Sequence, residues 1–343
     1  MKNNLFYYAT SELSQDAFIC WLCSFAFEDN TDPVLHKCAK NLLQLFVPEL
    51  VATEFTLLDV ERQVGHVDVL LTISAGSQTY KIIVEDKTFT SEHDNQLIRY
   101  LEQINSAYPD CVTKGVYYKT GFQSDLSSVI EAKYTIISRE QMLAFMAPYT
   151  NQTPNQIFLD YYEYWNSFQQ DVERFRSLPV CKWDWKQVNG FYDSLLTSKY
   201  FKDYGLWVGY GYVANQTGGF HGLWFGADDC CVNINGIPFE VFLQLETVVE
   251  TPSSAQLCLK FCAKDDNVER ESLSKCRDLV VYDEDWNYTL KEFHFCKPKR
   301  LARGRHMTIG LYNAELSDHL GVVAAFHNAI DDYLKILNKL RKL

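Results

Sequence analysis

"YKIIVEDKTFTSEHDNQLIRYLEQI", residues 80–104, joins a β-rich run directly to three charged residues and then to a helical pattern. The run from Ile82 to Val84 is apolar and rich in β-branched residues, which is typical of a strand inside a sheet. Because side chains alternate between the two faces of a strand, Glu85 and Lys87 share one face, while Asp86 points to the other. The strand therefore ends with an acid and an amine side by side.

A helix is predicted directly after this strand. Leu97 and Ile104 belong to its apolar face. Ser91, followed three residues later by Asp94, resembles a capping box, which places the start of the helix near Ser91. Gln96 then lies early in the helix, where its side chain can reach the charged end of the strand.

The preceding stretch, "HVDVLLTI", supplies a second carboxylate, Asp68, within an apolar run. Residues 74–77 indicate a turn, so the two strands are expected to pair antiparallel. Asp68 can then approach Glu85 where the strands meet the helix. The structural alternatives are an edge-strand carboxylate at Asp68 and a simple ion pair between Glu85 and Lys87, worth under about 1 kcal/mol.

The order of elements predicts an α/β fold. The pattern indicates helices near residues 13–27 and 34–46, a three-strand meander that begins near residue 52, a crossover helix, and a further strand after it. This order, αβββαβ, is assigned to residues 1–178. Residues 179–343 alternate like antiparallel strands and end in a helical pattern, so we expect a C-terminal α+β region that recognises substrate or mediates an interaction.

The paired acids and the lysine indicate metal chemistry. Two nearby carboxylates raise each other's pKa unless a cation lies between them, and Mg²⁺ or Mn²⁺ would resolve that conflict with oxygen ligands. Lys87 would bind a phosphate oxygen or lower the pKa of an attacking water. The set therefore predicts metal-assisted hydrolysis of a phosphodiester bond.

Asp68, then Glu85-Asp86-Lys87, then Gln96 resembles the motif of the PD-(D/E)XK nuclease superfamily, which has the restriction-endonuclease-like fold. The stretches "SELSQDAFICWL", "VGHVDVLL", "IIVEDK" and "NQLIRYLEQI" are together similar to a bacterial branch of that superfamily known mainly from genome sequences. The resemblance covers residues 11–146. The short motif alone arises often by chance, whereas four elements in the right order are more specific. Val67 stands where many members have Pro.

The resemblance implies a mixed-sheet αβββαβ core and a role for each matching residue. Asp68 and Glu85 would be metal ligands, Asp86 would contribute its backbone carbonyl, and Lys87 would be the catalytic lysine. Gln96 would contact phosphate or a metal-bound water.

Two further residues extend this set. Glu12, in the first helix, matches an acidic residue that many members contribute to the metal site. Alternatively, it is simply an acidic residue of the first turn, where the helix dipole favours negative charge. Tyr100 lies one helical turn after Gln96 on the same face, and we expect it to stack near the substrate.

A basic stretch in the second half bears on the partner. "CKPKRLARGRH" contains Lys297, Lys299, Arg300, Arg303 and Arg305. It is either a solvated loop or a patch that follows the phosphate backbone and guides DNA toward the site. The net charge of −12 argues against a protein that coats nucleic acid non-specifically, but not against a local basic cleft.

The expected activity is that of a Mg²⁺- or Mn²⁺-dependent deoxyribonuclease in restriction, repair or defence against phage and mobile DNA. The alternative is a catalytically silent nuclease-like module that binds nucleic acid or a protein. A small-molecule α/β enzyme is disfavoured, because the sequence contains no GxGxxG, P-loop or GxSxG motif. The sequence does not predict the oligomeric state.

Composition predicts a cytoplasmic protein without membrane association. Hydrophobic residues make up 47% of the chain, which suffices for a packed core. The most apolar stretch, residues 17–27, is shorter than the roughly 20 residues of a membrane span, and the first residues lack a secretory pattern. The 11 cysteines, including the Cys20/Cys23 pair, are then expected to be reduced core thiols.

Overall fold

The computed structural model describes residues 3–93, 95–198, 200–215, 218–250, 252–265, 267–283, 286, 290–295 and 306–342. The chain forms two compact units, residues 1–170 and 171–343, and each is considered by itself. The predicted role of residues 179–343 in substrate recognition stays a prediction.

The N-terminal unit alternates helices with strands. Its elements are α1 (Glu12–Ser24), α2 (Pro33–Phe46), β1 (Phe55–Val64), β2 (Val67–Ala75), β3 (Gln78–Lys87), α3 (Gln96–Ala107), β4 (Val112–Lys119), α4 (Ser127–Glu131), β5 (Thr135–Ser138), α5 (Arg139–Met146) and most of α6 (Gln156–Glu173). The first strand lies a few residues later than predicted, at Phe55 rather than near residue 52.

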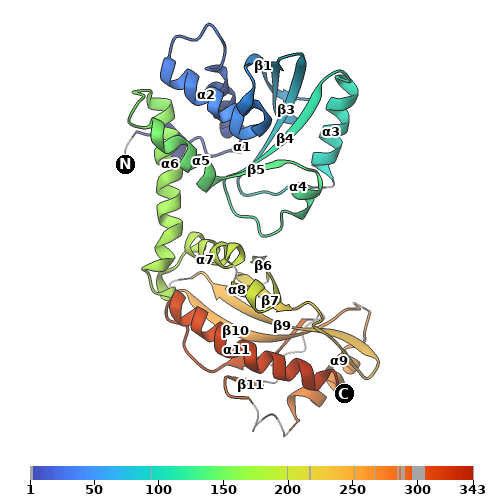
Figure 1. Ribbon diagram of the computed structural model, residues 1–343. Helices are drawn as coiled ribbons and strands as arrows, with labels where there is room; N and C mark the ends of the chain where they lie inside the picture. Colours follow the sequence, from blue (N-terminus) through green and yellow to red (C-terminus); the bar gives the residue numbers. More distant parts are fainter. Residues whose placement is uncertain are drawn as a thin grey trace. The chain divides into compact units, whose positions relative to one another are not determined.

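Strands β1 to β5 form one sheet in sequence order (Figure 1). β1, β2 and β3 pair antiparallel, whereas β3, β4 and β5 pair parallel. Helix α3 makes the crossover between β3 and β4, since parallel neighbours cannot be joined by a hairpin. The αβββαβ order and the mixed sheet confirm the predicted fold class.

Helices cover both faces of this sheet, with α3 on one side and α1 and α2 on the other (Figure 1). Leu97 of α3 packs in a buried cluster with Ile83 of β3 and Tyr117 of β4. On the opposite face, Gln15 of α1 donates a hydrogen bond to Thr120 just beyond β4, at 2.9 Å. The two faces of β3 therefore point toward different helices, α3 and α1.

The start of α3 differs from the prediction. The residue before the helix is Asn95, whose φ of 56° lies in the left-handed region, and its side chain makes no capping hydrogen bond. A start near Ser91 is therefore wrong, and Asp94, the second residue of the predicted capping box, lies outside the described residues. Asn tolerates the left-handed conformation better than most residues, so the chain can turn sharply there into the helix. As a result, Gln96 is the first residue of the helix, at the end nearest Lys87.

The C-terminal unit is the predicted α+β region. Its regular elements are α7 (Trp185–Thr197), α8 (Tyr200–Asp203), β6 (Leu206–Val213), β7 (Phe220–Ala227), β8 (Cys231–Ile234), β9 (Ile237–Val248), β10 (Ser254–Ala263), α9 (Arg270–Val281), β11 (Phe293–Phe295), β12 (His306–Tyr312) and α11 (His319–Leu340). The described strands form one sheet in the order β11-β12-β10-β9-β7-β6, with β8 paired to β9. Within the described residues, no helix combines the length and the apolar character that crossing a bilayer requires.

Candidate active site

The predicted site residues lie where β2 separates from β3. The antiparallel ladder runs from Ala75 opposite Gln78 to Val69 opposite Val84, and it stops there. Asp68 and Glu85 are the next residues on the two strands, so they face each other across the point of separation. β3 continues alongside β4 as far as Lys87, which is opposite Lys119. Where the ladder ends, backbone polar groups of β2 and β3 no longer pair with each other. The predicted site residues Asp68 and Glu85 lie at this point.

On the α3 side, four side chains form one connected network. Lys87 donates to Glu85 Oε1, and its Nζ lies 3.8 Å from Asp68 Oδ2. Gln96 Nε2 also donates to Glu85 Oε1, at 2.9 Å. Glu85 is fully buried, and its second oxygen accepts no hydrogen bond from the residues that the structure describes. This network joins two strands and the first turn of α3.

Burial sets the electrostatics of this network. Burial, reinforced by the charge of Asp68, raises the pKa of Glu85 to about 8 although Lys87 opposes the shift. Burial likewise raises the pKa of Asp68, again against the effect of Lys87. Burial alone would lower the pKa of Lys87, but Glu85 and Asp68 outweigh it and the pKa is raised. Lys87 is therefore an ammonium ion. Its single positive charge is not enough to neutralise both Glu85 and Asp68.

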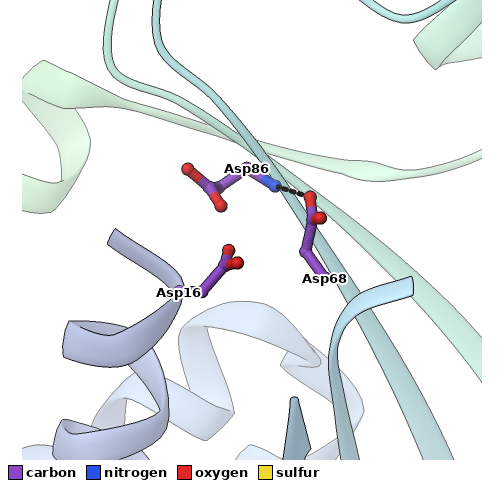
Figure 2. A group of neighbouring side chains, drawn as sticks. All are labelled: Asp16, Asp68 and Asp86. Atoms are coloured by element: carbon purple, nitrogen blue, oxygen red, sulfur yellow. Dashed lines mark hydrogen bonds between the residues drawn. The ribbon is translucent and has the colours of Figure 1, made fainter. Parts of the chain in front are cut away.

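On the α1 side, three carboxylates converge, as Figure 2 shows. Asp16, Asp68 and Asp86 each offer a ligand atom, and these atoms all lie within 4.8 Å of one another. The backbone N–H of Asp86 donates to Asp68 Oδ2 at 3.3 Å. Burial, together with the neighbouring Asp16, raises the pKa of Asp86 well above its ordinary value. Asp68 thus borders both sides of β3.

Asp16 is not among the site residues predicted from the sequence. A signal for it existed, because Asp16 follows Glu12 by four residues and therefore shares a helix face with it. The sequence predicts only a backbone role for Asp86, whereas the residue is 1% exposed and its side chain points toward the other two carboxylates.

Glu12 lies outside the group of three carboxylates. Its Oε1 accepts hydrogen bonds from Thr88 N at 3.0 Å and from Thr90 Oγ1 at 2.6 Å. Through these two hydrogen bonds, Glu12 connects the start of α1 to the chain just beyond β3. Its role as a metal ligand stays a prediction.

A second buried lysine lies close by. Lys119 is 6% exposed and donates to the carbonyl of Thr90. Burial lowers the pKa of Lys119 to about 8, although Glu12 opposes the shift. Lys119 could not be predicted from the sequence, because its position follows from the parallel register of β3 and β4.

The structure describes one of the two predicted nucleic-acid contacts, Tyr100, but not the other, the basic stretch. The ring of Tyr100 is 8% exposed and packs in the cluster under α3, so it is not available to stack on a substrate. Only its hydroxyl reaches the site, where it accepts from Gln96 at 2.7 Å. The basic residues Lys297, Lys299, Arg300, Arg303 and Arg305 lie outside the described residues.

The donor set fits a hard divalent cation. Glu85 Oε2 and both carboxylate oxygens of Asp86 accept no hydrogen bond within the described part of the chain, and all lie in a buried environment. Unpaired buried carboxylates are costly unless a cation compensates them, and oxygen ligands are those that Mg²⁺, Mn²⁺ and Ca²⁺ prefer.

Comparison with known proteins agrees with this geometry. Residues 6–162 match the family model of the PD-(D/E)XK nuclease superfamily. The searches of curated proteins and of solved structures found no match. The matched residues include the whole sheet β1–β5 and the helices α1 and α3 that contribute Asp16 and Gln96. Through this part of the chain, the protein is similar to the PD-(D/E)XK nuclease superfamily.

Proposed function

We propose that this protein is a metal-dependent deoxyribonuclease that hydrolyses phosphodiester bonds at the end of β2 and β3. The supporting observation is the contact of one ammonium group, that of Lys87, with two carboxylates from different strands, the buried Glu85 and the half-buried Asp68. A structural ion pair would need only one acid. The excess acid at this point suits a site that also accepts a divalent cation.

Asp68 and Glu85, with the backbone carbonyl of Asp86, would hold Mg²⁺ or Mn²⁺. The ion would supply charge neutralisation at the scissile phosphate and would acidify a water molecule. Both acids would have to lose their protons to bind it, and their raised pKa values make that loss depend on pH.

Lys87 would donate to a phosphate oxygen or to the attacking water. The residue is only 8% exposed, and the two carboxylates fix the position of its side chain, so little conformational freedom is lost when substrate binds. Gln96 Nε2 is engaged by Glu85 and Tyr100, which leaves its carbonyl oxygen oriented by these two contacts. Gln96 would thus position a water or a phosphate group next to Lys87.

The substrate assignment rests on phosphate chemistry and on the family. We propose DNA as the substrate, in restriction, repair or defence against phage and mobile DNA. The C-terminal unit would select the substrate. Its basic residues 297–305 would track the phosphate backbone, since the rest of the chain is acidic.

A substrate panel tests this proposal. Purified full-length protein is incubated with supercoiled plasmid, linear duplex, single-stranded DNA and RNA, each with Mg²⁺, with Mn²⁺ and with EDTA. We expect metal-dependent cleavage of at least one DNA substrate and none with EDTA. Binding of DNA without cleavage of any substrate would instead show a catalytically silent module.

A further inference from the structure

The sheet of the C-terminal unit has two different faces. Helices α8 and α11 pack on one of them, where Phe225 of β7 contacts the rings of Phe201 and Phe326. Because side chains alternate along a strand, Trp224 of β7 points to the other face. Trp224 is half-buried there, on the side of the sheet that is turned away from these two helices.

The indole of Trp224 lies flat on this second face. A Cβ atom on Gly209 would lie 2.6 Å from Trp224 Nε1, and one on Gly211 would lie 3.2 Å from Cη2, on the same edge of the ring. A Cβ atom on Gly222 would lie 3.2 Å from Cε3, on the opposite edge. Contacts along both edges mean that the ring is parallel to the sheet. Glycines in strand interiors often mark such a close approach.

A second indole occupies the same face. Trp207 of β6 is opposite Gly226, which follows Trp224 by two residues, so the two tryptophans share a face. A Cβ atom on Gly226 would lie 3.2 Å from Trp207 Cζ2. Trp207 Nε1 donates to the carbonyl of Ala227 at 3.0 Å, and the ring of Phe242 lies 6.0 Å away between centroids. Trp207 and Trp224 thus define one surface, the tryptophan face, on which both are half-buried and held against strand backbone.

Polar side chains of the neighbouring strands adjoin the two indoles. Gln244 of β9 is opposite Trp224, and its Nε2 donates to Glu246 Oε1 at 3.0 Å. Lys260 of β10 donates to the same Glu246 oxygen and to Thr308 Oγ1. Hydrogen-bonding groups therefore lie next to flat aromatic rings. Proteins that bind unpaired nucleobases combine these features, because the rings stack on the base faces and the polar groups bond to the base edges.

The charge around the tryptophan face suits a polyanion. Residues 204–227, which contain β6 and β7, include no Asp, Glu, Lys or Arg, whereas the whole chain has a net charge of −12. On β9, Glu246 is paired with Lys260. Residues 296–305, which link β11 to β12 of the same sheet, include five lysines and arginines. A phosphate backbone would therefore meet less repulsion at this sheet than on the acidic remainder of the chain.

We propose that the tryptophan face binds single-stranded DNA, with Trp207 and Trp224 as two stacking positions for unpaired bases. In a duplex the faces of each base are covered by its neighbours, so a stacking surface selects single strands. The inference rests on the proposed function, because it names the class of DNA on which the same protein acts. Since every base has a π-face, the tryptophan face would tolerate any sequence.

Binding in EDTA tests the inference without cleavage. A fluorescein-labelled oligothymidylate and a duplex of the same length are titrated with full-length protein, and fluorescence anisotropy reports binding. We expect the wild-type protein to bind the single strand at least about 10-fold more tightly than the duplex. Trp207→Leu and Trp224→Leu should each weaken single-strand binding by about 10-fold, because each removes one stacking ring. Tyr212→Leu, which changes an exposed aromatic residue on the other face of β6, is the matched control and should bind like the wild-type protein.

Equal affinity of the wild-type protein for single strand and duplex would overturn the proposal, and so would wild-type single-strand affinity in both tryptophan variants. If those variants also dissociate a wild-type dimer in sedimentation experiments while DNA binding is unchanged, the tryptophan face is an interface between two copies of the chain. If single strands bind through the tryptophans but no substrate is cleaved with metal, the nuclease proposal fails and this one stands. Cleavage of duplex by a protein that does not bind single strands would have the opposite meaning.

A second measurement needs no variant. An oligothymidylate that contains 5-iododeoxyuridine forms crosslinks on irradiation with aromatic side chains on which the base stacks. Mass spectrometry of the digested wild-type complex should place crosslinks at Trp207 or Trp224. Crosslinks at neither tryptophan would contradict the stacking surface. This readout keeps the proposal testable if a leucine variant fails to fold.

Discussion

The backbone N–H of Asp86 donates a hydrogen bond to the Asp68 carboxylate at 3.3 Å, just beyond the last paired residues of β2 and β3. The bond holds Asp68 at the edge between the two faces of β3. Asp68 can therefore approach Lys87 on one side and Asp16 on the other. This one contact explains why loss of Asp68 should affect more of the site than loss of any other acid.

Lys87→Met should slow DNA cleavage by about 10²–10⁴-fold, because the ammonium group would no longer reach the phosphate or the attacking water. Mn²⁺ affinity should stay the same or rise, since a positive charge next to the ligands is gone. The measurements are single-turnover cleavage and calorimetry. Lys81→Met is the matched control, because Lys81 is also buried on this face of β3 but bonds to Thr72. An equal loss of cleavage rate in both variants would show that removal of either buried lysine of this strand has the same effect, so that Lys87 has no specific role.

Gln96→Ala should lower the cleavage rate by about 10–100-fold with little change in stability. The side chain contributes a hydrogen bond to Glu85 but lies at the half-buried start of α3. Tyr100→Phe removes only the hydroxyl that accepts from Gln96, so a smaller loss is expected. Gln103→Ala, on the exposed part of the same helix, should cleave at the wild-type rate. A wild-type rate in Gln96→Ala would exclude Gln96 from the chemistry.

The metal-free protein should lose stability as the pH rises from about 5 to about 8. Glu85 has a pKa of about 8 in the folded protein, and an unfolded glutamate has a pKa of about 4.3. Between these values the folded state binds the extra proton, so raising the pH favours unfolding, by at most about 1.4 kcal/mol per pH unit for this group.

Urea denaturation of the wild-type protein and Glu85→Gln in EDTA measures this effect. The variant should be about as stable as the wild-type protein near pH 5 and more stable near pH 8. A difference between the two that does not change with pH would show that Glu85 titrates normally.

Glu12→Ala should lower the free energy of unfolding by about 1–3 kcal/mol, because it removes the acceptor of Thr88 N and Thr90 Oγ1. Glu12→Gln should recover much of that loss, since its amide oxygen can accept the same bonds. Glu102→Ala on the exposed face of α3 serves as the control in denaturation experiments. A Glu12→Gln protein of normal stability that binds Mn²⁺ more weakly would reveal the metal-ligand role that the sequence predicts.

The strand part of the site could be predicted because it depends on local geometry. Alternation along β3 separates Glu85 and Lys87 from Asp86 whatever the rest of the fold does. The turn between β2 and β3 similarly brings Asp68 opposite Glu85. These relationships need only the backbone period and one hairpin.

The rest depends on how separate elements pack. Asp16 reaches Asp86 only because α1 lies against that face of the sheet, and no spacing in the sequence gives that angle. Tyr100 shares a helix face with Gln96, but the same face also builds the core, and burial of the ring removed it from the substrate side. The start of α3 depends on the left-handed conformation of Asn95, which the sequence does not predict. The local pattern at Ser91 instead resembles a helix start.

In the proposed function, Asp68 is the residue that organises a metal-dependent cleavage site. The most direct test compares the wild-type protein with Asp68→Asn in single-turnover cleavage of DNA at saturating Mg²⁺ or Mn²⁺, with circular dichroism to verify folding. We expect cleavage by the wild-type protein that EDTA abolishes, and a rate at least about 10³-fold lower in the folded variant. Equal rates in the two proteins, or cleavage that persists in EDTA, would contradict it.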